Sequence, residues 1–165
     1  MVAASGVRSR PRLWVGWREW VVLPGLGVER IKAKVDTGAA TSALHAVHVR
    51  RYRESGLDRV TFEIHPIQRR TDITVRCIAD VVAERIVTSS TGHRECRLVI
   101  RTPMLIAGRR WSIKLTLTNR DSMGFRMLLG RRAMKGRLLV DPNASYLAGA
   151  ADSELAGAAR RRESR

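Results

Sequence analysis

The chain has 165 residues and a formal net charge of +16. This length fits one domain with its own core, and a hydrophobic content of 44% is typical of a globular protein rather than a disordered or fibrous one. No apolar run approaches the roughly 18 residues that a membrane-spanning helix needs, so no membrane association is expected. The N-terminus lacks the apolar segment of a secretory signal, and two cysteines are too few for a disulfide framework. The sequence therefore predicts a cytoplasmic protein.

The basic excess creates a positive field that attracts polyanions, such as nucleic acids or acidic polypeptides. Arginine-rich composition can also follow from genome composition, so the charge alone identifies no ligand. The chain has only eight aromatic residues and no evident base-stacking motif, which argues against a dedicated nucleic-acid reader. The only lysines are Lys32, Lys34, Lys114 and Lys135.

The first half of the chain is a series of predicted strands and turns. Residues 1–12 form a basic leader that we expect to be disordered. Residues 31–35 alternate apolar and basic side chains, as in a strand with one buried face, and the alternation stops at the turn Asp36-Thr37-Gly38. Residues 47–58 are polar and end in Ser55-Gly56, which indicates a connecting segment. The predicted strands are 13–23 and 28–35, joined as a hairpin by 24–27, followed by 60–64 and 73–78.

The second half is predicted to be a meander of hairpins. One hairpin has its tip at residues 89–92, and the next turns at Gly108. Residues 132–136 are expected to form a short helical turn capped by Gly136. The predicted strands are 81–87, 96–101, 104–107, 111–118 and 138–141. Residues 13–147 are thus expected to form one all-β domain with a closed or sandwiched architecture, followed by a disordered Ala- and Arg-rich tail at 148–165.

Two motifs far apart in the chain carry a family resemblance. The segments Asp36-Thr37-Gly38-Ala39 and Leu128-Leu129-Gly130-Arg131 resemble the catalytic loop and the hydrophobic-hydrophobic-Gly strand of retropepsin-type aspartic proteases. More closely, residues 14–146 are similar to a bacterial family named ATP-dependent zinc proteases, retropepsin relatives found near ATP-grasp glutamate ligases. Ala40 departs from this pattern, which usually has a basic residue there, and Asn119 stands where an Asp is common. The resemblance implies a closed retropepsin-like β-barrel with a flap hairpin.

The resemblance also implies roles for individual residues. Asp36 would be the catalytic carboxylate, Thr37 would bond the partner loop, and Gly38 and Ala39 would complete the catalytic loop. Leu128, Leu129, Gly130 and Arg131 would lie behind this loop, and Ser89, Ser90 and Gly92 in the flap would close over the substrate.

Hydrolysis by two carboxylates needs a second copy of the chain. Two carboxyls held close together share one proton, so one can act as base and the other as acid. Only one Asp-Thr-Gly occurs in the sequence, so a dyad requires Asp36 from each of two protomers. The sequence therefore predicts a homodimeric aspartic endopeptidase, and its charge and resemblance together suggest acidic, glutamate-rich peptides as substrate.

Two other functions remain open at the level of sequence. A zinc-dependent protease could use Asp36, His45 and His48, although no His-Glu-x-x-His motif is present. No phosphate-binding Gly-rich loop for ATP occurs either, and we expect no cofactor. The second alternative function is a non-enzymatic basic module that binds polyanions. Four charged residues could be either solvated strand positions or contacts to substrate or partner: Glu95, Arg97, Arg120 and Arg131.

Overall fold

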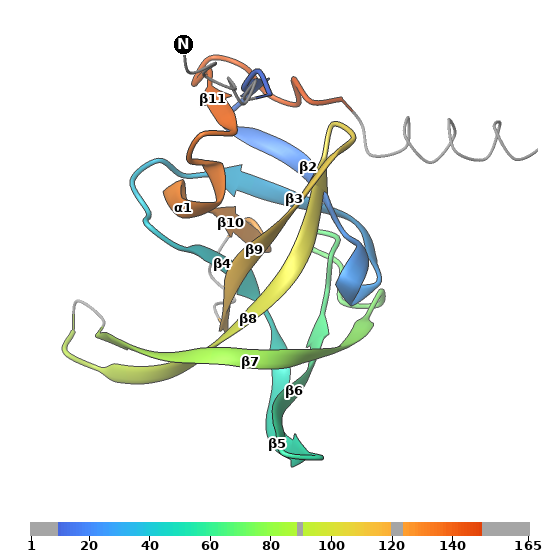
Figure 1. Cartoon of the computed structure of the whole chain (residues 1–165), viewed down its shortest axis with the longest axis vertical. Helices are drawn as coiled ribbons and strands as arrows, with labels where there is room; N and C mark the ends of the chain where they lie inside the picture. The colour runs from blue at the N-terminus through green and yellow to red at the C-terminus, as the bar shows by residue number, and fades with distance from the viewer. Residues whose placement is uncertain (1–9, 89–90, 120–123, 150–165) are drawn as a thin grey trace, which may run out of the picture.

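The computed structural model describes residues 10–88, 91–119 and 124–149. Within these ranges the chain is all-β, apart from a short α-helix and one 3₁₀ turn (Figure 1). The elements are β1 (Leu13–Val15), β2 (Arg18–Leu23), η1 (Pro24–Leu26), β3 (Val28–Val35), β4 (Ser42–His45), β5 (Val47–Glu54), β6 (Leu57–Ile64), β7 (Val75–Thr88), β8 (Arg94–Ile106), β9 (Arg109–Thr118), β10 (Met127–Leu129), α1 (Arg131–Met134) and β11 (Leu138–Val140). No helix among the described residues is long and apolar enough to cross a membrane.

Six of these strands close into a barrel in the order β2-β3-β10-β4-β9-β8. The barrel closes where Val22 of β2 pairs with Leu105 of β8. Strands β7, β6 and β5 extend the sheet beyond β8, and Figure 1 shows this extension below the barrel. The closed retropepsin-like β-barrel that the sequence predicts is therefore confirmed.

The barrel interior follows the alternation in the sequence. In β3, Ile31, Ala33 and Val35 are buried, whereas Lys32 and Lys34 face outward. The same alternation in β9 buries Trp111, Ile113 and Leu115. Because the hydrophobic effect stabilises each buried aliphatic side chain by about 1.5–3 kcal/mol, this core holds the strand end that precedes Asp36 in a fixed position.

The prediction that residues 47–58 form a connecting segment is wrong. They form β5 and the start of β6, a hairpin that turns at Ser55 and Gly56 with φ of 49° and 78°. Strand β5 is an edge strand with mostly exposed side chains, so it shows no apolar alternation. Its pairing with β6 is supported by cross-strand ion pairs such as Arg51–Asp58 and Arg59–Glu54.

Other strand boundaries differ from the prediction because two strands continue through positions at which the sequence predicts a strand end. The predicted strands 73–78 and 81–87 are one strand, β7, which contains a bulge between Val81 and Ala83. The predicted strands 96–101 and 104–107 are also one strand, β8, which continues through Pro103. The hairpin turn at Gly108 and the helical turn ending at Gly136 are present, with φ of 73° and 75° at the two glycines.

A buried carboxylate joins the two ends of the domain. Glu19 of β2 is 0% exposed. Its Oε1 accepts hydrogen bonds from the N–H groups of Gly16 (2.7 Å) and Leu147 (2.8 Å), and its Oε2 accepts one from Ala148 (3.3 Å). Nearby, β1 pairs in parallel with β11. Glu19 therefore fixes the segment after β11 to the barrel.

Glu19→Ala should destabilise the fold by about 3 kcal/mol, because it removes charge-assisted hydrogen bonds and leaves buried N–H donors unpaired. The free energy of unfolding, measured by urea titration, reports this loss. Glu29→Ala, which removes an exposed carboxylate from β3, is the matched control and should change stability by less than about 0.5 kcal/mol. Equal stability of the two variants would show that the Glu19 contacts contribute nothing.

The two cysteines differ in environment. Cys77 of β7 is buried, and burial raises the pKa of its thiol to about 11. Cys96 of β8 is exposed and donates a hydrogen bond to Glu84 (Sγ to Oε2, 3.5 Å). Partial desolvation and this bond raise the pKa of Cys96 as well. A raised pKa lowers the thiolate fraction, so neither thiol has the character of a reactive nucleophile.

Candidate active site

The loop after β3 holds the carboxylate of Asp36 in one orientation. Its Oδ1 accepts hydrogen bonds from the backbone N–H groups of Gly38 (2.8 Å) and Ala39 (3.2 Å). This is an Asx-type turn, in which a short acidic side chain substitutes for backbone pairing. The second carboxylate oxygen takes no part in these bonds. Asp36 is partly buried, and Thr37 and Gly38 beside it are exposed.

Strand β10 lies behind this loop and fixes it to the barrel. It pairs in parallel with β3 and antiparallel with β4. The N–H of Asp36 donates to the carbonyl of Leu129 (2.9 Å), and the N–H of Arg131 donates to the carbonyl of Ala39 (2.8 Å). The structure thus places the segment Leu128–Arg131 directly against the Asp36 loop.

Gly130 lies where no side chain fits. A Cβ at this position would lie 2.5 Å from the carbonyl carbon and oxygen of Thr41. Its N–H donates to the hydroxyl of Ser42 (3.0 Å). Sequence reasoning did not assign a role to Ser42, because a hydroxyl that accepts a bond from a residue 88 positions away leaves no local signal.

Arg131 reaches back to the exposed side of the loop. Its guanidinium Nη1 donates to the carbonyl of Thr37 (2.9 Å). Arg131 is the first residue of α1 rather than a strand residue, and its side chain supports the loop that carries the carboxylate. Thr37, Ala40 and Arg131 also border an open groove of about 630 Å³, whose other walls include Met134 and the β11 residues Leu138, Leu139 and Val140.

The predicted flap is the hairpin formed by β7 and β8. Its strands pair from Val81–Ile100 to Thr88–Arg94, and Figure 1 shows its free end projecting beyond the barrel. Gly92 lies in the turn with φ of 82°, which favours glycine. Ser89 and Ser90 lie outside the described residues.

A hollow of about 580 Å³ separates this hairpin from the strand after the Asp36 loop. Thr41 and Ala43 form one wall, and Arg85, Val87 and Arg97 lie on the hairpin side. Thr41 is five residues beyond Asp36 in the chain. The hollow therefore lies between the β7–β8 hairpin and the segment that follows the Asp36 loop.

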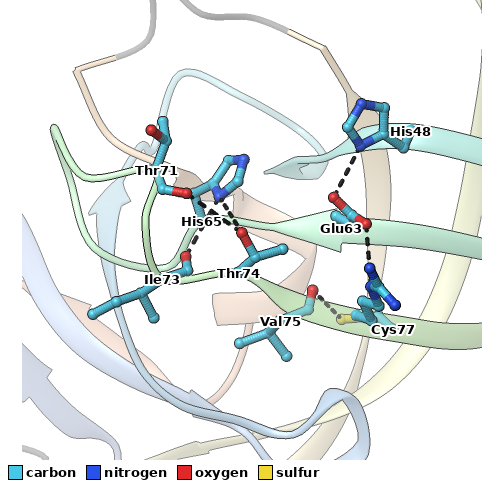
Figure 2. A network of polar contacts seen from close by, with 9 residues as sticks. His48, Glu63, His65, Thr71, Ile73, Thr74, Val75 and Cys77 are labelled. Atoms are coloured by element: carbon cyan, nitrogen blue, oxygen red, sulfur yellow. Dashed lines mark hydrogen bonds and ion pairs between the residues drawn. The ribbon is translucent and has the colours of Figure 1, made fainter.

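The three residues of the alternative zinc site do not come together. Among the described residues, no group of three or more His, Cys, Asp and Glu side chains is placed to hold a metal ion. His45 is buried in β4, whereas His48 lies in β5 with its Nδ1 2.9 Å from Glu63 Oε2 (Figure 2). The hydrogen bond with His48 lowers the pKa of Glu63, helped by the charge of Arg76. His65 belongs to a separate set of contacts with Thr74 and Ile73 (Figure 2).

Comparison with known proteins identifies the family of the chain. Residues 14–151 match a family model described as RimB-like, retropepsin-like aspartic endopeptidase RimB. A probable alpha-L-glutamate ligase of Shewanella pealeana is 50% identical over 135 residues, which are 82% of this chain and 30% of that protein. One of Desulfotalea psychrophila is 45% identical over 149 residues, or 90% of this chain and 32% of that protein. The chain thus spans about a third of the curated relatives that it matches.

A solved structure shares the fold. A Legionella pneumophila protein of unknown function superposes with a TM-score of 0.70 and 23% sequence identity, covering 84% of this chain and 99% of that one. The chain belongs to the RimB-like family of retropepsin-like aspartic endopeptidases.

Proposed function

We propose that this protein is an aspartic endopeptidase that hydrolyses α-glutamyl peptide bonds in acidic peptides, using Asp36 from each of two protomers. The observation that carries the proposal is the Asp36 carboxylate, held by two N–H groups on a loop that β10 fixes to the barrel. Such a fixed acid at an exposed edge suits hydrolysis by an activated water, for which general acid–base catalysis supplies about 10²–10⁴-fold.

The chemistry needs two carboxyls in different protonation states. The ionised Asp36 accepts a proton from water as the water oxygen attacks the scissile carbonyl carbon. The partner's Asp36, which is protonated, donates a hydrogen bond to the carbonyl oxygen. Collapse of the tetrahedral intermediate breaks the C–N bond, and the Asp36 carboxyl that took the proton from water passes it to the leaving nitrogen. Because one proton is shared, activity should be highest at acidic pH.

The open groove beside Thr37 supports dimerisation. Thr37 and Gly38 are exposed, and the groove next to them is walled by Met134, Leu138, Leu139 and Val140. A second copy placed against this face by a twofold axis would cover these apolar side chains and bring its own loop toward Asp36.

Acidic substrates are supported by charge and by the relatives. The net charge of +16 attracts polyanionic chains. The curated relatives are named as probable alpha-L-glutamate ligases and contain a region like this chain in about a third of their length. A peptidase joined to an enzyme that adds α-linked glutamate is suited to cleave the same bonds.

Incubation with a synthetic oligo-α-L-glutamate peptide, followed by mass spectrometry, tests the proposal. We expect internal cleavage at acidic pH that is insensitive to EDTA. Loss of cleavage with EDTA, regained with zinc, would support a metal-dependent hydrolase instead. Tight binding without any cleavage would identify a binding module.

A further inference from the structure

The flap hairpin carries two arginines directly opposite each other. Arg85 of β7 and Arg97 of β8 are cross-strand partners in the antiparallel ladder, so their side chains leave the same face of the sheet about 5 Å apart at Cβ. Like charges in this arrangement destabilise a sheet. The repulsion between Arg85 and Arg97 therefore lowers the stability of the hairpin, and the packing of the fold does not explain why both arginines are present.

Only one of the two arginines is compensated. Arg97 has a side chain that is 13% exposed, and its Nε and Nη2 both lie 3.1 Å from Oε2 of Glu95. Within the described ranges, no ion pair or hydrogen bond of the Arg85 side chain is found. Glu95 thus occupies two donor nitrogens of Arg97, whereas Arg85 keeps its donors available.

Both arginines line the hollow between the hairpin and the segment that follows the Asp36 loop. The 580 Å³ hollow lies between them and the residues Thr41, Ala43 and Thr116. Arg85, Thr41 and Thr116 also border a second hollow of about 440 Å³, which runs toward α1. The residues lining these two hollows include six basic ones and, among the described residues, no acidic one. The basic lining residues are Arg85, Arg97, Lys114, Arg132, Lys135 and Arg137.

When all the charged residues that line a concave site are basic, the electric field is focused into the site and concentrates anions there. A planar carboxylate fits two facing guanidinium groups, because each can donate two parallel N–H bonds to it. A bound carboxylate would also remove the repulsion between Arg85 and Arg97.

We propose that Arg85 and Arg97 form a subsite that binds a side-chain carboxylate of the peptide substrate and so determine specificity for acidic residues. The assignment of the ligand as a peptide rests on the proposed function. The arginines do not touch the reacting atoms, and they act by selecting which chain occupies the space between flap and catalytic loop.

Binding can be measured separately from hydrolysis. The full chain carrying Asp36→Asn is titrated into a fluorescently labelled oligo-L-glutamate peptide, with an oligo-L-glutamine peptide as the neutral control. We expect Arg85→Gln and Arg97→Gln each to weaken binding of the glutamate peptide by about tenfold or more, with no change for the glutamine peptide. Arg94→Gln is the matched control, because Arg94 lies on the same hairpin but alternates to the opposite face. It should change binding by less than about twofold.

Thermal stability separates this role from a structural one. Arg85→Gln removes one of two like charges, so the Tm of this variant should be unchanged or higher, although its binding of the glutamate peptide weakens. A variant that loses Tm and binding together would show that Arg85 serves the fold. Glu95→Gln should strengthen binding by about two- to fivefold, since Glu95 competes for Arg97.

Two outcomes would overturn the proposal. One is equal binding of the glutamate peptide by the parent, Arg85→Gln and Arg97→Gln. The other is tighter binding of an oligonucleotide of equal charge, lost in the same variants, which would assign the hollow to nucleic acid. If the arginine variants lose binding but the unmodified chain cleaves no peptide, the subsite stands and the proposed hydrolysis fails. If cleavage persists with unchanged specificity in both variants, the hydrolysis stands and the subsite fails.

Discussion

Asp36→Asn should reduce peptide hydrolysis by about a thousandfold or more, because it removes the group that accepts the proton of water. Asparagine keeps an Oδ1 that can accept the hydrogen bonds from Gly38 and Ala39, so the loop should keep its shape. The measurement is the initial rate on the oligo-α-L-glutamate peptide, alongside the free energy of unfolding. Activity within a few-fold of the unmodified chain would remove Asp36 from the mechanism.

A paired control keeps this result interpretable. Asp141→Asn changes a carboxylate that accepts a bond from the N–H of Asn143 (2.9 Å) in the exposed turn after β11. It makes the same chemical change away from the Asp36 loop. We expect its activity to stay within about twofold, which would attribute the loss in Asp36→Asn to position rather than to charge.

Gly130→Ala should be among the most damaging single substitutions in the chain. Its methyl group would lie 2.5 Å from the carbonyl of Thr41 and 3.0 Å from its nitrogen. The two backbone segments cannot easily move apart, because hydrogen bonds hold them together. Gly130 donates to the Ser42 hydroxyl, and its neighbour Arg131 donates to the carbonyl of Ala39. We expect a loss of about 3 kcal/mol or more in the free energy of unfolding, together with loss of hydrolysis as the Asp36 loop shifts.

Gly124→Ala is the appropriate comparison for this experiment. A Cβ at Gly124 meets nothing within 4 Å, so its stability should change by less than about 1 kcal/mol. Urea denaturation of both variants gives the difference directly. Similar stabilities for the two would mean that the contact between β10 and the loop is looser than the structure indicates.

Alternation of apolar residues predicted β3 and β9, because their inner faces are buried, whereas β4 was not predicted as a strand and β10 was indicated only by the family resemblance. The same signal fails for β5, whose side chains are mostly exposed and whose pairing depends on β6 and on ion pairs. It also fails at the bulge in β7 between Val81 and Ala83. A bulge shifts the register by one residue and so decides which side chains of β7 face the hollow beside Thr41 and Ala43.

The residues of the candidate site also fall into two groups, those that the sequence indicated and those that it did not. The Asp36 turn and the segment around Gly130 are short local motifs, so the family resemblance could identify both of them from the sequence. Arg85 was not singled out, because its importance comes from its cross-strand position opposite Arg97. The pairing register of a hairpin that contains a bulge depends on the tertiary structure, so the residues around Arg85 in the sequence do not predict that it lies opposite Arg97.

The most direct test of the two-protomer mechanism is a crystal structure of the protein bound to an uncleavable oligo-glutamate peptide with a hydroxyl in place of the scissile carbonyl. We expect a twofold axis between two copies, with the two Asp36 carboxylates about 3 Å apart and both in contact with the hydroxyl. A single copy binding the peptide, or two copies whose Asp36 groups are too far apart to share one water, would contradict it.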